Sequence, residues 1–411
     1  MRNYAIVTGS YWGFTLTDGA LRMLVLLHFY QLGYTPFTLS VLFLLYEAAG
    51  IVANLGGGWL AVHFGIPRML AVGLGLQVAG LLMLSATDPA WSAAASVAWV
   101  MAAQGISGLA KDLTKTASKA AIKAAEAQAG ERLFRLVAWF TGSKNAMKGV
   151  GFLLGGVLLQ AIGFHLALWL MAGLLGLLFV LVLASLPREF GKAKASRSFR
   201  ELFAKSRAVN LLAAARIFLF GARDVWFVVG LPVFLYGQGW RFAEVALFLA
   251  LWTIGYGMVQ GIAPSVIRRS GDGLSREVPE ARLWMAVLTG IPALLAVLLG
   301  TAIARPDLVV VAGLALFGFV FAVMSSLHSY LILAYAGSKK AAEDVGFYYA
   351  ANAGGRFLGI LLSGLLTQWA GLSACLWGAA VMLAVCLCLT FTLPTRLTAN
   401  PLAAEKGLPA G

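Results

Sequence analysis

The chain has 411 residues, of which 60% are hydrophobic and only 12% are charged, and its formal net charge is +14. A soluble domain carries about 25% charged residues, so the composition excludes an ordinary soluble protein. A helix needs about 20 apolar residues to cross a bilayer, and such runs recur along the whole chain. The sequence therefore predicts an all-α integral membrane protein.

Twelve apolar stretches predict twelve transmembrane helices. The first is too long for the core of a cleavable signal peptide and contains Asp18 and Arg22, so we expect a permanent span. In chain order the stretches are 5–31, 38–62, 68–86, 91–112, 133–160, 163–186, 209–236, 242–267, 283–303, 307–335, 345–369 and 372–394.

Lysine and arginine gather in alternate loops, which is the positive-inside pattern. The loops of the opposite set contain only Arg241 and Arg305, matched by nearby acids. The pattern predicts a multi-pass protein of the cell inner (plasma) membrane with both termini in the cytoplasm, and it accounts for the positive charge without nucleic acid. The cationic stretches are 111–135, 187–208, 268–282 and 336–344.

The longest polar stretch divides the chain into two halves that resemble each other. The segment 155–163 is similar to 363–371, and the same offset places Lys148 opposite Arg356. Two six-helix repeats with a substrate site at the midplane between them form a known transporter plan. We expect an N-terminal bundle over 1–186, a cytoplasmic basic linker over 187–208, a C-terminal bundle over 209–396 and a cytoplasmic tail over 397–411.

The loop after the second span, residues 58–68 (GWLAVHFGIPR), resembles the loop signature of the major facilitator superfamily. Its glycines, Leu60 and Arg68 match that signature, whereas Val62 and His63 replace the usual Asp and Arg. The resemblance implies the fold of that superfamily.

Ionisable side chains inside a bilayer are costly, at about 2.5–3.5 kcal/mol each on insertion scales, and therefore mark functional sites. Six cations and three acids fall within the predicted spans, so the interior has a cationic excess that a bound organic anion would neutralise. They are Asp18, Arg22, Glu47, Lys144, Lys148, Arg216, Arg223, Asp224 and Arg356.

Polar side chains at three- to four-residue spacing share one face of a helix, and Tyr348, Asn352 and Arg356 follow this spacing. The depth of each residue along its span and the helix face that it shares predict two sets of site residues. The substrate-binding set is Arg22, Lys144, Lys148, Arg223, Arg356, Asn352 and Tyr348, and the set that couples or tunes the site is Asp18, Glu47 and Asp224.

Several of these charges also have structural explanations. Asp18 and Arg22, four residues apart, would neutralise each other on one helix face. Asp224 would neutralise Arg216 or a cation on another helix, and Glu47 would be a packed, protonated carboxyl. Lysines at the end of the fourth span, Lys111 and Lys115 with Asp112 between them, would be topology charges at the cytoplasmic edge.

The sequence contains no nucleotide-binding loop, zinc-ligand spacing or nucleophile elbow. Its three cysteines, Cys375, Cys386 and Cys388, all fall in the last span and predict neither a disulfide framework nor a thiolate metal site. We therefore expect a secondary transporter, not an enzyme, with no cofactor and no metal.

Four segments resemble the ArsJ-type organoarsenical efflux permeases of the major facilitator superfamily, within a similarity that extends from Tyr4 to Pro394. They are residues 11–22 (YWGFTLTDGALR), 110–115 (AKDLTK), 141–152 (TGSKNAMKGVGF) and 220–232 (FGARDVWFVVGLP).

The resemblance implies export of 1-arseno-3-phosphoglycerate in arsenate resistance, in functional partnership with glyceraldehyde-3-phosphate dehydrogenase. We expect a monomer. Such a substrate has an oxyanion at each end, so two cationic clusters are needed. Arg22 and Arg223 with the helix-five lysines would serve one end, and Arg356 with Tyr348 and Asn352 the other.

Three other functions compete with this one. An exporter or exchanger of sugar phosphates or other organic anions fits the same charges. A multidrug pump fits less well because cationic drugs would be repelled by the interior cations. A membrane scaffold or receptor would not need polar stripes at mid-depth.

Overall fold

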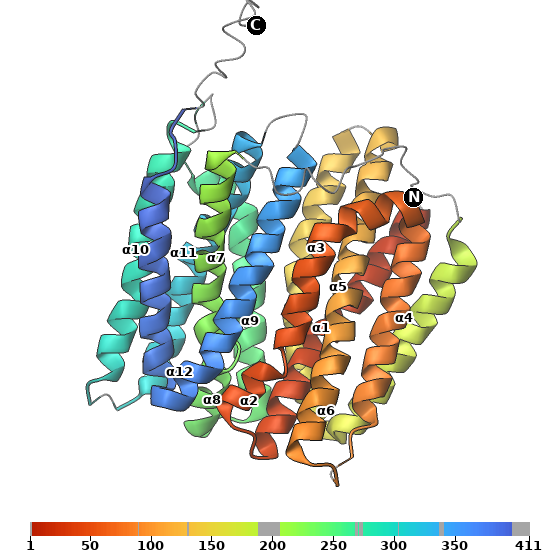
Figure 1. Cartoon of the computed structure of the whole chain (residues 1–411), viewed down its shortest axis with the longest axis horizontal. Helices are drawn as coiled ribbons and strands as arrows, with labels where there is room; N and C mark the ends of the chain where they lie inside the picture. Colours follow the sequence, from red (N-terminus) through yellow and green to blue (C-terminus); the bar gives the residue numbers. More distant parts are fainter. Residues whose placement is uncertain are drawn as a thin grey trace, which may run out of the picture.

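The computed structural model describes residues 2–88, 90–129, 131–187, 206–267, 270, 274–302, 304–336 and 341–396. Within these ranges all regular secondary structure is helical (Figure 1). The helices are α1 (Arg2–Gln31), α2 (Pro36–Val41), α3 (Leu44–Phe64), α4 (Ile66–Ser85), α5 (Ala93–Ala129), α6 (Glu131–Ser185), α7 (Arg207–Phe227), α8 (Gly230–Gly237), α9 (Phe242–Val266), α10 (Glu277–Leu299), α11 (Pro306–Tyr335) and α12 (Ala341–Phe391).

Nine helical stretches of the described chain are long and apolar enough to cross a membrane. Two of them contain a non-helical break, at Gly163 in α6 and at Ala370–Gly371 in α12, and each break separates two spans. The 30-residue α1 contains Asp18 and Arg22, which lower its hydropathy, but it is also long enough to span. With these additions the described part of the chain has twelve spans, as predicted.

The break at Ala370–Gly371 coincides with the predicted loop, and Gly163 directly follows the loop predicted at 161–162. Gly163 has a φ of 78° and Gly371 a φ of 67°, a backbone region that glycine enters without steric cost. The chain therefore reverses at equivalent places in its two halves, and Figure 1 shows α12 running down the bundle and back up again.

Two predicted spans are interrupted, which the sequence analysis did not foresee. The span predicted over 38–62 is divided between α2 and α3 by a turn at Leu42–Phe43, and that over 209–236 is divided between α7 and α8. The Ser363 hydroxyl of α12 accepts hydrogen bonds from the freed amides of Val229 and Gly230, at 3.2 and 3.3 Å. Buried backbone groups at membrane depth need such partners.

Helices α1 and α6 cross at glycines in the first bundle, and α7 and α12 cross at glycines in the second. A Cβ added at Gly151 would collide with the backbone of Leu16, and one at Gly359 would lie 2.5 Å from the Gly221 carbonyl oxygen. Small residues allow membrane helices to approach this closely. Gly151 follows Lys148 by three residues and Gly359 follows Arg356 by three, so equivalent crossings position two of the predicted cations.

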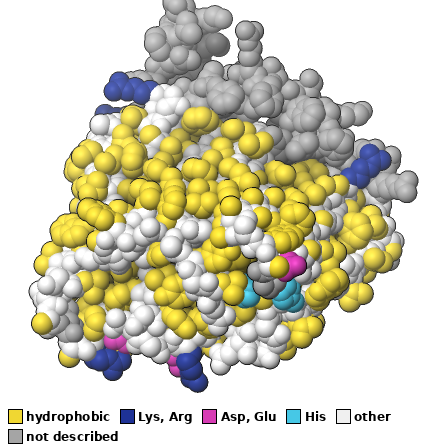
Figure 2. Space-filling view, turned by 60° about the horizontal axis from the view of Figure 1, so that its bottom comes forward, with side chains coloured by type: hydrophobic (Ala, Val, Ile, Leu, Met, Phe, Trp, Pro, Cys, Tyr) yellow, Lys and Arg dark blue, Asp and Glu magenta, His cyan; other side chains and the backbone are white. Residues whose placement is uncertain are grey.

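The flanks of the molecule are apolar, as lipid contact requires. Large hydrophobic side chains are exposed along them, among them Leu166, Trp169, Leu177, Met258 and Trp369. Figure 2, in which the lower end of the molecule comes forward, shows mostly hydrophobic and uncharged side chains, with acidic and basic groups side by side at its lower edge.

Helix α1 begins and helix α12 ends on the same side of the bundle, opposite the lower rim (Figure 1). Helix α5 continues to Ala129 and α6 begins at Glu131, so most of the loop predicted over 111–135 is helical. Most of the predicted linker (188–205) and the predicted tail (397–411) lie outside the described residues. The boundaries of the two bundles stay a prediction.

Candidate functional site

A cavity of about 720 Å³ lies between the two bundles, on the side of the molecule where α1 begins and α12 ends. Its lining comes from eight spans, mostly from the half of each span that is nearest that side. The lining residues are Tyr11, Phe14, Thr15, Asp18, Glu47, Asn54, Lys111, Asp112, Lys115, Lys144, Asn145, Lys148, Arg216, Phe220, Arg223, Tyr256, Gln260, Ser325, Ser326, Ser329, Tyr349, Asn352, Ala353 and Arg356.

The lining is strongly cationic. Four lysines and three arginines face the cavity, against three acidic side chains, Asp18, Glu47 and Asp112. All three acids belong to the first bundle, on α1, α3 and α5. Among the described residues, the wall that the second bundle contributes has arginines but no lining acid.

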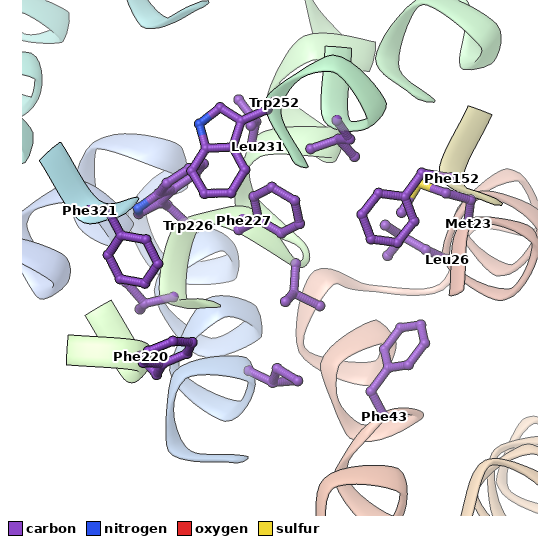
Figure 3. Close-up of a cluster of buried hydrophobic side chains, with 14 of the residues drawn as sticks. Met23, Leu26, Phe43, Phe152, Phe220, Trp226, Phe227, Leu231, Trp252 and Phe321 are labelled. Carbon is purple, nitrogen blue, oxygen red and sulfur yellow. The ribbon is translucent and has the colours of Figure 1, made fainter. Parts of the chain in front are cut away.

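An apolar layer closes the cavity on the opposite side. Phe152 of the first bundle meets Phe227 of the second, with ring centres 6.2 Å apart, and Phe227 packs on Trp252 at 5.0 Å. Figure 3 shows these rings converging with Phe43 and Leu231 from neighbouring elements. The charged groups therefore face one side of the molecule and are separated from the other by packed hydrophobic side chains.

Glu47 is the centre of an ion-pair network that joins the bundles. It is fully buried and accepts hydrogen bonds from Arg22 of its own bundle at 2.8 Å and from Arg356 of the other bundle at 2.5 Å. The Lys111 ammonium lies 4.0 Å from its second oxygen. Glu47 is thus a bridging carboxylate and not an isolated packed carboxyl.

Asp224 extends this network within the second bundle. Its carboxylate accepts from Arg223 at 2.7 Å and from Arg356 at 3.2 Å. Of the two partners predicted from the sequence, Arg216 or a cation on another helix, the structure shows the second, Arg356 of α12, together with Arg223 of α7. Arg22, Glu47, Arg356, Asp224 and Arg223 therefore form one chain of alternating charges that still has an excess of one cation.

Asp18 does not pair with Arg22, although the two share a helix face. Its carboxylate accepts a 2.5 Å hydrogen bond from the Tyr46 hydroxyl, and the Tyr46 ring lies 3.9 Å from the Lys111 ammonium. Tyr46 was missed by sequence reasoning because a single tyrosine among apolar residues is not distinguished by its pattern. It connects Asp18 of α1 to Lys111 of α5.

Lys144 and Lys148 face the cavity from α6, one helical turn apart. The Lys148 ammonium lies 5.6 Å from the Phe152 ring centre, and no described carboxylate lies within 4.0 Å of it. Between these lysines, the Asn145 amide donates to Gln260 of the other bundle at 3.0 Å. Lys148 is therefore a half-buried cation within cation–π distance of an aromatic ring.

The predicted grouping of Arg356 with Tyr348 and Asn352 is not what the structure shows. Arg356 points to Glu47 and Asp224, whereas the Asn352 carbonyl oxygen accepts from Arg216 at 3.1 Å. The Tyr348 ring is fully buried, lies 4.8 Å from the Arg216 guanidinium carbon, and does not line the cavity. The three residues share a helix face but serve two different arginines.

The charges at the end of the fourth span belong to the cavity and are more than topology charges. Asp112 is buried and accepts from Lys115 at 2.7 Å, and Lys115 also donates to Asn54 of α3 at 2.9 Å. The signal for this was present in the sequence, since Gln104, Ser107 and Lys111 share one helix face. Among the described residues no cluster of His, Cys, Asp or Glu would hold a metal ion.

A family model described as Major Facilitator Superfamily matches residues 7–343, which is most of the chain. The chain belongs to the major facilitator superfamily. Membership makes it a multi-pass membrane transporter of small substrates. No match was found among curated protein sequences.

Solved structures of major facilitator transporters share this fold at low sequence identity. A mutant of the nucleoside transporter NupG has a TM-score of 0.72 at 14% identity, covering 95% of this chain and 98% of its own. The human organic anion transporter MFSD10 (TETRAN) has 0.64 at 16%, covering 95% and 100%. A POT family transporter in complex with a thioalcohol-conjugated peptide has 0.73 at 13%, covering 94% and 95%.

The superfamily plan accounts for which helices reach the cavity. In it, spans one, four, seven and ten line the central cavity, and two, five, eight and eleven flank it. Here the lining comes from α1, α3, α5, α7, α9, α11 and the first halves of α6 and α12. Within the described chain, α4, α10 and the second halves of α6 and α12 contribute nothing to it.

Proposed function

We propose that this transporter exports an organic oxyanion from the cytoplasm, and that its substrate is 1-arseno-3-phosphoglycerate. The observation that supports the proposal is the charge of the cavity, where seven cationic side chains face three acidic ones. Unpaired charge removed from water is costly, so a site with this excess is completed by a bound anion.

The excess of positive charge in the cavity remains when the ion pairs of Glu47 and Asp224 are taken into account. The alternating chain through Glu47 and Asp224 keeps one surplus cation, and neither acid contacts Lys148 or Arg216 within 4.0 Å. Arginine and lysine at the end of a buried cavity bind phosphate-like groups through charge-assisted hydrogen bonds. A dianionic group beside Lys148 and Arg223 would balance this part of the site.

Resemblance supports the arsenical substrate within the class of organic anions. The segments that resemble the organoarsenical efflux permeases contribute Lys144, Lys148 and Arg223 to the cavity. No cysteine lines the described cavity, and a carrier of arsenite would favour thiols. These features favour an oxyanion ester over arsenite.

The proposal includes the direction of transport and the membrane in which the protein lies. With both termini in the cytoplasm of an inner-membrane protein, the cavity faces the compartment in which glyceraldehyde-3-phosphate dehydrogenase makes the arsenical ester. The proposed transporting unit is a monomer.

Arsenic uptake into everted membrane vesicles tests the proposal. The vesicles receive glyceraldehyde-3-phosphate dehydrogenase, glyceraldehyde 3-phosphate, NAD and arsenate, and accumulated arsenic is measured. We expect uptake that requires the dehydrogenase and is abolished in Lys148→Met. The exposed Arg241→Gln, which changes a surface pair with Glu244, is the control for charge removal. Uptake that continues without the dehydrogenase would contradict the arsenical substrate.

A second candidate, exchange of sugar phosphates, is favoured by the neutral part of the wall. Tyr256, Gln260 and Ser325 form a hydrogen-bonded group, with Gln260 donating to the Tyr256 hydroxyl at 2.8 Å and Tyr256 donating to Ser325 at 3.2 Å. Such groups suit the hydroxyls of a sugar. Counterflow of a radiolabelled sugar phosphate without arsenate would support this candidate over the first.

A further inference from the structure

Arg216 is a buried cavity arginine held by neutral groups alone. Only 4% of its surface is exposed, it lines the cavity from α7, and no described carboxylate forms an ion pair with it. Its Nε donates to the Asn352 carbonyl oxygen at 3.1 Å and its Nη1 to the Ser325 backbone carbonyl at 3.2 Å. These acceptors orient the guanidinium without neutralising it.

Arg216 and Arg223 share one aromatic ring. Their guanidinium carbons lie 4.0 and 4.9 Å from the centre of the Phe220 ring, so their separation cannot exceed the sum of these two distances. The two arginines are seven residues apart, which is two helical turns, and therefore lie on one face of α7. Phe220 lines the cavity between them.

The surroundings of Arg216 suit an anion and the hydroxyls next to it. Ser325, Ser326 and Ser329 of α11 line the same part of the cavity, together with Tyr256 and Gln260 of α9. The nearest acid on α7, Asp224, is occupied by Arg223 and Arg356. A guanidinium has five N–H donors, of which two are used here, so three remain for a ligand.

We propose that Arg216 forms a second anion subsite, distinct from the Lys148–Arg223 position, which binds the far phosphate or carboxylate of a substrate with two anionic groups. The inference rests on the proposed function and adds the residue that selects substrates charged at both ends. The planar fork of Arg216 binds one oxyanion bidentately, and the short reach across Phe220 limits the ligand to a small carbon skeleton.

Two available three-carbon compounds serve as probes of the subsite. 3-Phosphoglycerate has a phosphate and a carboxylate, and glycerol 3-phosphate has the phosphate alone. Binding of each to the purified full-length protein in nanodiscs is measured by calorimetry. We expect the wild-type protein to bind 3-phosphoglycerate more tightly. Arg216→Gln should lose about ten- to a hundredfold affinity for it, since a hydrogen bond to a charged group contributes about 1.5–3 kcal/mol.

The affinity of Arg216→Gln for glycerol 3-phosphate should stay unchanged. Arg216→Lys keeps the charge but loses the fork, and should show a smaller selective loss, so it replaces Arg216→Gln if the latter does not fold. Arg241→Gln should bind both probes as the wild type does. Equal weakening of both probes, or of neither, in the Arg216 variants would overturn the subsite. A wild-type protein that binds neither probe would also overturn the subsite, whereas dehydrogenase-dependent arsenic uptake into vesicles tests the proposed transport independently.

Discussion

At the scale of single residues, Glu47 has the most demanding position in the site. It neutralises Arg22 and Arg356 together, and these arginines come from different bundles. One carboxylate between two guanidiniums is stable only while it stays ionised and hydrogen-bonded. Without this carboxylate, the positive charges of Arg22 and Arg356 would repel each other.

Glu47→Gln should therefore destabilise the protein strongly. Loss of one partner of a buried ion pair costs about 3–5 kcal/mol, whereas loss of an exposed pair costs about 0–1 kcal/mol. Thermal unfolding in detergent should show a large drop in Tm for Glu47→Gln and almost none for Glu244→Gln, whose partner Arg241 is on the surface. Similar drops for both variants would show that Glu47 does not stabilise the site.

The order of the charges on α1 should also matter. Exchange of the pair, Asp18→Arg with Arg22→Asp, keeps the net charge of the helix but places a carboxylate opposite Glu47 and an arginine at the Tyr46 hydroxyl. We expect loss of transport, measured as arsenate tolerance in cells, with normal protein level in the membrane. Full tolerance in the exchanged variant would mean that Asp18 and Arg22 serve only as a neutral patch.

Sequence alone predicted which charges reach mid-depth but not which of them pair. Depth follows from counting along a span. Lys144, Lys148, Arg223 and Arg356 line the cavity, whereas Arg22 and Tyr348 of the same predicted set do not. Pairing depends on how each helix is rotated against its neighbours. Asn352 and Arg356 are one turn apart, about 6 Å along the axis, and this offset is enough to assign one to Arg216 and the other to Glu47.

At the scale of the helices, hydropathy located the spans, and the structure shows that the chain reverses at Gly163 in α6 and at Gly371 in α12. The turn between α2 and α3 could not be predicted, since Leu42 and Phe43 are ordinary residues for a helix. The end of α5 was placed too early because hydropathy detects only the membrane-embedded part. The alanine-rich stretch up to Ala129 has high helix propensity and continues the helix beyond it.

Because α7 and α12 cross closely, we expect that there is no room for a side chain at Gly359. A Cβ there would lie 2.5 Å from the Gly221 carbonyl oxygen, so Gly359→Ala forces the helices apart and displaces Arg356, one turn earlier. We expect a lower Tm and loss of transport. Gly173→Ala is the matched control, because nothing lies within 4 Å of a Cβ at that position. Equal behaviour of the two variants would contradict a tight crossing.

At the scale of the complete transporter, the contacts between the two bundles are apolar on one side of the ion-pair network around Glu47 and polar on the other. On one side packed aromatic rings, with Phe152 against Phe227, separate the cavity from the rim opposite the chain termini. On the other side polar groups such as Asn145 and Gln260 connect the bundles. Rocking of one bundle against the other about a fixed site, as in transporters of this plan, would open the aromatic contact and bring the cavity to the outer face.

The charge of the proposed substrate determines how export is driven. Each phosphate-like group contributes roughly −1.5 to −2 at neutral pH, so the substrate carries about −3 to −4. One elementary charge crossing 100 mV is worth about 2.3 kcal/mol. With the cytoplasm negative, export of this anion is favourable by roughly 7–9 kcal/mol per 100 mV before any concentration term. The membrane potential is therefore sufficient without a coupled proton.

We expect electrogenic export, in which Asp18, Glu47 and Asp224 orient and balance the cations and do not carry an obligatory proton. Purified protein in liposomes, with an imposed potassium-diffusion potential and no pH gradient, should move the anion toward the positive side. Flux should rise with the potential and vanish when it is collapsed by valinomycin in symmetrical potassium. Flux that ignores the potential but follows an imposed pH gradient would refute electrogenic export, and one of these three carboxylates would then be the proton carrier.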